Sequence, residues 1–272
     1  MHQDRILTPR GGPSASAGNH QCTRLPLLLL LAFALAPQCL AQAADEYRRV
    51  EVYGGYSLAR VNSNVEQLAA TSPGGTQTFS NLCSAATGEM IGTNSQKFFC
   101  ERRNFNGFDA SVTYNVSRYF GLKGNVTGHF KQETFVDDFG GITQTIGVRE
   151  RLYNFLGGVQ LKDNRVGGGR LRPFAHVLAG AAHYTNQETQ TIDAFPQFDY
   201  VAEDSVTSFA LKLGGGLDVR AGRRIDIRAV EFDYNPAFVG DRGFKTVSGP
   251  FTFRTEGRTA HNYTIGFGVV IH

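Results

Sequence analysis

Ionisable side chains occur at alternate positions of several apolar stretches, and they have the most evident chemistry in this sequence. In FDASVTYNV, residues 108–116, Asp109 stands between aromatic and aliphatic residues. Successive side chains of a strand point to opposite faces, so the charges share one face and the apolar residues the other. The predicted set of charges on that polar face is Glu51, Asp109, Lys123, Lys162, Lys212, Asp218, Arg220, Asp226 and Arg228. Because their signs are mixed, they predict ion pairs between acids and bases.

Residue combinations typical of catalysis or metal binding are weak by comparison. The histidines follow no metal-site spacing and are predicted to be interior or interface residues; they are His129, His176, His183 and His261. The segment His183-Tyr184-Thr185 comes nearest to the Ser–His pair of a membrane-embedded hydrolase, but it has a Thr in place of the Ser. The sequence therefore predicts no catalytic residue, no cofactor and no metal site, and the protein is not expected to be an enzyme.

Two acidic pairs and one glycine run have alternative readings. Asp137-Asp138 and Glu203-Asp204 fall in predicted loops, where they either bind cations that bridge lipopolysaccharide or are solvated charges. The run at 214–216 is three glycines inside a strand pattern, so it is not a phosphate-binding loop. Glycines within strands suit the tight curvature of a small barrel.

Eight alternating stretches are predicted to be the strands that position the charges. They lie at about residues 50–60, 108–116, 120–130, 146–162, 171–184, 205–220, 225–236 and 259–271. Short turns and long segments alternate between them, and the long segments are at about 61–104, 131–145, 185–204 and 237–258. Strands joined by tight turns form antiparallel hairpins. Each strand has about ten residues or more, the length that a tilted strand needs to cross a bilayer.

Two of the strands depart from regular alternation. In the strand at 225–236 the apolar phase changes after Ile227. One extra residue near Ala229–Val230 would restore the pattern, as a β-bulge does. The strand at 171–184 alternates too poorly to be oriented.

The apolar faces of these strands pack either against lipid or against a protein core. Beyond the N-terminal segment no run approaches 18 apolar residues, so only a closed barrel could cross a membrane. We therefore predict an all-β fold, an eight-stranded antiparallel up-and-down transmembrane β-barrel with short periplasmic turns and long extracellular loops. Its interior has room only for side chains, and paired charges are expected to fill it in place of an apolar core. The alternative is a soluble barrel with the apolar face inside.

The N-terminus predicts export. Arg24 precedes the apolar run LPLLLLLAFALA, and Ala41-Gln42-Ala43 is a small-x-small cleavage site. We expect a signal peptide at 1–43 and the barrel domain at 44–272, although a retained anchor is the alternative. Residues 1–43 hold three of the 27 basic and one of the 24 acidic side chains, which leaves a formal charge of about +1 on the remainder. With so little net charge and no basic cluster, nucleic acid is not an expected partner.

Two cysteines remain in the predicted mature chain. In an exported protein, Cys83 and Cys100 are expected to form a disulfide that closes a loop within the first long segment. Two free thiols are the alternative.

The pattern as a whole resembles the OmpA-like and OmpX-like eight-stranded outer-membrane β-barrels, over about residues 47–272. The motifs that carry the resemblance are EVYGGYS, FDASVTYNVSRYFGLKGNVTGHF, RPFAHVLAGAAH, ALKLGGGLDVRAGRRIDIRAVEFDY and YTIGFGVVIH. Such barrels usually end in Phe or Trp, whereas here His272 follows Ile271. No segment like a peptidoglycan-binding domain follows the last strand, so the resemblance covers the barrel domain alone.

The resemblance implies a protein of the cell outer membrane, exported through the secretory pathway. Its expected role is structural or surface-exposed, with loops available for binding or adhesion; the alternatives are a narrow porin-like diffusion channel and a soluble lipocalin-like binding barrel. Its expected partners are outer-membrane lipids, lipopolysaccharide and the outer-membrane assembly machinery, and it is expected to be a monomer. Arginines at the short-turn strand ends either meet lipid phosphates or keep the turns soluble, and they are Arg48, Arg49, Arg118, Arg223 and Arg224.

Overall fold

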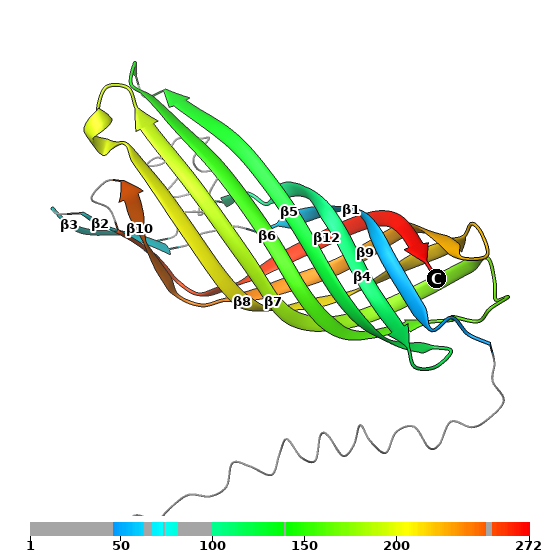
Figure 1. Cartoon of the computed structure of the whole chain (residues 1–272). Coiled ribbons are helices and arrows are strands. Elements are labelled where there is room, and N and C mark those ends of the chain that lie inside the picture. The colour runs from blue at the N-terminus through cyan, green and yellow to red at the C-terminus, as the bar shows by residue number, and fades with distance from the viewer. Residues whose placement is uncertain (1–45, 63–66, 73, 81–99, 139, 249–251) are drawn as a thin grey trace, which may run out of the picture. The chain divides into compact units, whose positions relative to one another are not determined.

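The computed structural model (Figure 1) describes residues 46–62, 67–72, 74–80, 100–138, 140–248 and 252–272. The predicted signal peptide at 1–43 and Cys83 lie outside these ranges, so the signal peptide and the Cys83–Cys100 disulfide stay predictions. No helix among the described residues is long and apolar enough to cross a membrane. The fold belongs to the compact unit Asp45–His272.

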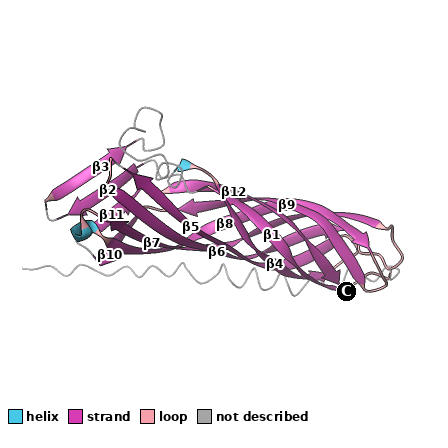
Figure 2. Ribbon diagram, turned by 90° about the horizontal axis from the view of Figure 1, so that it is seen from above, coloured by secondary structure: helices cyan, strands magenta, loops and turns pink. Residues whose placement is uncertain are grey.

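Eight long strands form a closed antiparallel barrel, as predicted. The barrel strands are β1 (Val50–Val61), β4 (Arg103–Asn115), β5 (Phe120–Asp138), β6 (Thr143–Lys162), β7 (Leu171–Ile192), β8 (Tyr200–Arg220), β9 (Ile225–Val239) and β12 (Arg258–Ile271). Their order around the wall is β8-β7-β6-β5-β4-β1-β12-β9, and pairing of β8 with β9 closes the ring (Figures 1 and 2). The three short turns join β4 to β5, β6 to β7 and β8 to β9. We call their end of the barrel the short-turn end and the opposite end the loop end.

The predicted irregularity in β9 is present. Both neighbouring ladders shift register there: Gly266 pairs with Glu231 but Gly268 pairs with Arg228, and Leu217 and Asp218 show the same jump opposite β9. The prediction of a β-bulge near Ala229–Val230 is confirmed.

Several strands are longer than predicted at the loop end. Residues 131–145 were expected to be a long loop, but β5 continues to Asp138 and β6 begins at Thr143, so a tight connection joins them. Likewise β7 runs to Ile192 and β8 starts at Tyr200, with only a 3₁₀ turn at Pro196–Phe198 between. The outward residues of these extensions are mostly polar, among them Gln132, Thr134 and Thr189, so the apolar alternation that marks a lipid-facing strand fades although the hydrogen-bond ladder continues.

The other two long segments also contain strands. They are β2 (Gln67–Ser72), β3 (Gly75–Ser80), β10 (Arg242–Ser248) and β11 (Thr252–Thr255). Their order β3-β2-β11-β10-β8 attaches them to the loop end of β8 (Figure 2). We call these four strands the loop-end sheet. The segments predicted as long loops thus contain paired strands of their own, β2 with β3, β2 with β11 and β10 with β11.

The apolar faces point outward. Val112 and Tyr114 are 54% and 50% exposed, whereas Asp109 and Lys123 are 3% and 2% exposed. The same division holds around the barrel, and the band of outward apolar side chains is named the lipid-facing belt. Its members include Val52, Tyr56, Phe108, Phe130, Phe155, Val177, Phe209, Phe232, Phe267 and Ile271. A soluble barrel would bury this face, so that alternative does not fit the structure.

Candidate functional site: the barrel interior

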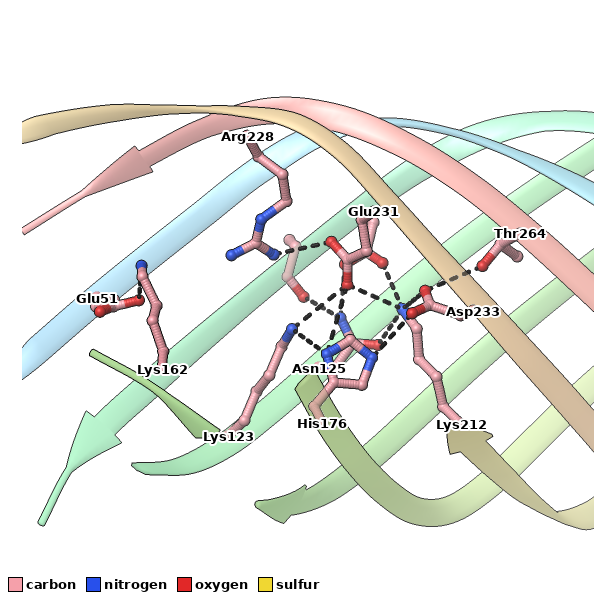
Figure 3. Close-up of polar contacts among 12 residues, drawn as sticks. Glu51, Lys123, Asn125, Lys162, His176, Lys212, Arg228, Glu231, Asp233 and Thr264 are labelled. Carbon is pink, nitrogen blue, oxygen red and sulfur yellow. Dashed lines mark hydrogen bonds and ion pairs between the residues drawn. The ribbon is translucent and has the colours of Figure 1, made fainter. Parts of the chain in front are cut away.

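The short-turn half of the interior is filled by a connected set of ion pairs, which we call the interior network. Seven of the eight barrel strands send charged side chains into it, and β12 adds the hydroxyl of Thr264, which donates to Asp233 Oδ2 (Figure 3). Its acids are Glu51, Asp109, Asp218, Asp226, Glu231 and Asp233, and its bases are Arg48, Lys123, Lys162, Arg172, Lys212 and Arg228. Opposite charges are equal in number, which is what an enclosed site of low dielectric requires.

The outermost layer of the network surrounds Asp226 at the short-turn end. Arg48 and Arg172 each place a guanidinium nitrogen 3.4 Å from this carboxylate. His272 reaches it from the C-terminus, with Nε2 at 2.9 Å from Oδ2. The residue that departs from the usual terminal Phe or Trp therefore lies inside the barrel and closes the end of the network.

The next layer joins Lys162 and Arg228 through their shared partner Asp218. Lys162 Nζ lies 3.0 Å from Glu51 Oε2 and 2.8 Å from Asp218 Oδ2. The guanidinium of Arg228 donates to both oxygens of Asp218, at 2.8 and 3.2 Å. This bidentate pairing is the strongest geometry available to an arginine and a carboxylate.

The deepest layer joins Glu231, Asp233 and Asp109 to two lysines. Lys212 Nζ lies 2.6 Å from Asp109 Oδ2 and 3.0 Å from Asp233 Oδ2. Lys123 Nζ lies 3.5 Å from Glu231 Oε1. Figure 3 shows these side chains converging from opposite walls, so the network crosses the whole interior.

The β-bulge allows Arg228 and Glu231 to point inward together. In a regular strand residues three apart face opposite sides, but here both are buried and their side chains form a 2.8 Å ion pair. The guanidinium also lies 4.1 Å from the ring centre of Tyr53 and 4.0 Å from that of Phe174. Two aromatic faces thus hold this cation as well as its carboxylates.

Glycines in β8 leave room for the network. A Cβ atom at Gly214 would collide with the Asp233 carboxylate, and one at Gly216 would collide with the backbone of Val230 and the Phe174 ring. The glycine run lies within the strand, as predicted, and clears space for inward side chains.

One predicted residue, Arg220, is not joined to the ion pairs. Its Nε and Nη2 atoms are buried without a hydrogen-bond partner among the described residues. The other eight residues of the predicted set all belong to the interior network. The set lacked four members of the network, which are Arg48, Arg172, Glu231 and Asp233. Arg172 was missed because the alternation of β7 was too poor to orient, although Pro173 and Val177 place it on the inward phase once the strand is paired.

Three side chains come close enough together to share a metal ion. His176, Glu231 and Asp233 each offer a ligand atom within 4.8 Å of the others, a juxtaposition that sequence spacing did not reveal. However, Lys123 Nζ lies 3.3 Å from Nδ1 of His176, and Lys212 Nζ lies 3.0 Å from Asp233. These ammonium groups would repel a divalent cation, so the group fits an ion-pair network better than a metal centre.

An apolar cluster follows the interior network toward the loop end, contrary to the prediction of charge throughout. Its buried members are Ala59, Val61, Phe105, Leu152, Leu156, Leu178, Ala182, Ala210, Ala237 and Ala260. They occupy the same inward phase as the charges, but closer to the loop end. The prediction was wrong because it considered only the charged residues on the polar face and overlooked the inward apolar ones.

A second polar layer lies beyond this apolar cluster. Arg103 Nη2 lies 2.7 Å from Glu150 Oε1, which also accepts a hydrogen bond from the Tyr184 hydroxyl. Arg242 pairs with Asp204 at 2.9 Å. Asp204 and its neighbour Glu203 were expected in a loop, but both lie in β8.

The histidine that comes nearest to a catalytic pattern in the sequence is His183. His183 Nδ1 contacts Thr207 Oγ1 at 2.8 Å on the outer surface, and no carboxylate among the described residues orients it.

Comparisons with known proteins identify the family to which this barrel belongs. The family model described as "Outer membrane protein beta-barrel domain" matches residues 26–271. Ail, the attachment invasion locus protein of Yersinia pestis, is 12% identical over 82% of this chain and 100% of its own, with a TM-score of 0.35. The outer membrane protease OmpT from Escherichia coli is 10% identical over 85% and 99%, with a TM-score of 0.44. OprG from Pseudomonas aeruginosa is 11% identical over 83% and 97%, with a TM-score of 0.39. No curated protein matches the sequence.

The family match covers nearly the whole barrel, and the closed ring of eight strands with an outward apolar belt is the structure that such a domain requires. A place in the outer membrane follows from it. The chain belongs to the outer-membrane β-barrel domain family.

Proposed function

We propose that this protein is a surface-exposed outer-membrane barrel with a closed interior, whose loop-end sheet serves for binding or adhesion. The interior network is the observation that supports this most directly. Passage through the barrel would require several buried ion pairs to separate at once, and an unpaired charge in such an interior is costly. The monomeric state, and insertion by the outer-membrane assembly machinery, remain expectations.

The loop-end sheet supports the surface role. Its β2–β3 hairpin pairs Gln67 with Ser80 and turns at Gly75, whose φ of +131° suits glycine. Most of β3 is exposed, and Thr71 and Thr76 share a hydroxyl hydrogen bond of 2.9 Å across the turn. A sheet of this kind presents a defined polar surface, which a partner can recognise at a lower entropic cost than a flexible loop.

Planar-bilayer recording of the purified protein tests the closed interior. We expect no stable conductance from the natural protein. The double variant Lys123→Ala/Glu231→Ala removes both members of one contact and keeps the charge balanced, so it is expected to open a small conductance. A stable conductance in the natural protein would favour the narrow channel instead.

Surface labelling tests the orientation. In a Cys83→Ser/Cys100→Ser background, Thr78→Cys in β3 should react with a membrane-impermeant maleimide on intact cells. Ser117→Cys in a short turn is the matched control and should react only after lysis. Cells that produce the protein are then compared, on a panel of immobilised glycans, with cells whose 67–80 hairpin is replaced by a Gly-Ser turn. Equal adherence at equal surface abundance would count against the binding role.

A further inference from the structure

Two arginines on β6 lie just beyond the loop-end edge of the lipid-facing belt. Arg149 and Arg151 point away from the barrel, and both side chains are exposed. In the ladder Arg151 lies beside Phe130, which belongs to the belt, and beside Thr185 of β7. Both guanidinium groups are therefore at the level where hydrocarbon gives way to lipid head groups.

These two guanidinium groups have no ion pair or hydrogen bond among the described residues. Two arginines at the loop end of the opposite wall do have side-chain partners. Arg60 donates to Asn104 Oδ1 at 3.2 Å, and the guanidinium of Arg102 lies 5.4 Å from the ring centre of Tyr263. Residues two apart on one strand face are about 7 Å from each other. Arg149 and Arg151 thus place two positive charges side by side without a neutralising partner among the described residues.

The surface around the pair is hollowed and rich in hydrogen-bond donors. A shallow depression of about 460 Å³ is lined by both arginines together with Thr185, Gln187 and Ser205. Two acids border it. Glu203 accepts a 2.9 Å hydrogen bond from Gln187, and Asp204 is held by Arg242 on the other side of the sheet.

We propose that Arg149 and Arg151 bind a phosphate group of a phosphorylated lipid in the outer leaflet. A guanidinium is matched to phosphate because its planar fork donates two parallel hydrogen bonds, and two forks can hold one group from two sides. The level of the site selects a lipid rather than a soluble anion, since the acyl chains of a lipid held there would lie along the belt below Arg151, past Tyr153 and Phe155. The inference is independent of whether the barrel conducts.

Native mass spectrometry of the full barrel tests the site, with lipid A carrying two phosphates as the probe and its dephosphorylated form as the comparison. We expect the natural protein to bind the phosphorylated form more tightly. The double variant Arg149→Gln/Arg151→Gln should weaken that binding about tenfold or more. The matched control Arg60→Gln/Arg102→Gln removes the same charge from the two arginines of the opposite wall that already have side-chain partners, and it should leave the binding unchanged.

Two further variants sharpen the result. Arg149→Lys/Arg151→Lys keeps the charge but loses the fork, so it should recover only part of the affinity. Glu203→Gln removes the bordering carboxylate and should raise the affinity. Equal binding of both forms of lipid A by the natural protein, or unchanged binding by the double Gln variant in a folded barrel, would overturn the proposal.

Discussion

The two halves of the barrel interior solve the same packing problem with opposite chemistry. At the short-turn end, side chains such as Asp218 and Lys212 fill the space as ion pairs, whereas at the loop end Phe105 and Leu178 fill it as an apolar cluster. Both sets come from the same strands in the same inward phase. An eight-stranded barrel must be filled, but the filling can be polar if every charge is paired. The stability of the charged half depends on every charge keeping its partner. The stability of the apolar half depends on side chains that fill the available volume.

Removal of one acid from the charged half should have the largest effect. Asp218→Ala leaves Lys162 and Arg228 without their shared carboxylate, and breaking a buried pair in this way costs about 3–5 kcal/mol of unfolding free energy. Urea titration in lipid vesicles, followed by the mobility of unheated samples on a denaturing gel, measures the loss. A loss under about 1 kcal/mol would mean that the cations find other partners, and that the network tolerates gaps.

A cavity in the apolar half should cost somewhat less. Leu178 is 1% exposed, and Leu178→Ala is expected to cost about 3 kcal/mol from lost burial and the cavity left behind. The neighbouring Val177→Ala faces lipid and is the control, with a loss under about 1 kcal/mol because no closed cavity forms. If both substitutions cost the same, the loop-end half does not act as a packed core.

The terminal histidine should matter less than either. His272→Gln removes the 2.9 Å contact with Asp226 but leaves Arg48 and Arg172 on that carboxylate. We expect a loss of about 1 kcal/mol in the same titration. Asp226→Asn is the companion variant and should cost more, since three partners lose their charge complement. The reverse order would show that the C-terminal residue, rather than Asp226, is the centre of that layer.

The smallest effect is expected at the short turn after β6. Hydrogen bonds from Arg118, and then from Arg165, hold the pKa of Asp163 well below its usual range. A carboxyl with a lowered folded-state pKa adds stability above its unfolded pKa and loses it as the pH falls towards the folded value. Asp163→Asn should thus cost under about 1 kcal/mol at pH 7, and the difference should shrink below pH about 4. A constant difference across that range would exclude ionisation as its cause.

Much of the fold could be predicted because strand periodicity records which face meets lipid. Strands β1, β9 and β12 were predicted to within a few residues, and the bulge in β9 followed from a change of phase. The loop-end extensions could not be predicted, since their outward residues are mostly polar and leave no apolar alternation to detect. The loop-end sheet depends on pairing between segments far apart in the chain, such as β2 with β11, which local pattern does not encode.

The sequence predicts which residues point into the interior, but not which of them contact one another. Inward parity identified Asp109 and Lys212, yet their 2.6 Å contact joins residues about one hundred positions apart and depends on barrel geometry. Arg172 was missed because alanines and glycines blur the phase of β7. The pair Arg149 and Arg151 was also missed, although both lie in the strand predicted at 146–162, because the apolar alternation of that strand is clear only in its later half.

The bulge in β9 has a consequence for changes in chain length. The charged residues on both sides of Ala229–Val230 point inward only because the bulge adds one extra residue there. Deleting a single codon at this point would turn one end of the strand inside out, presenting Asp226 and Arg228 to the acyl chains. Strand β9 must therefore keep its residue count on both sides of the bulge.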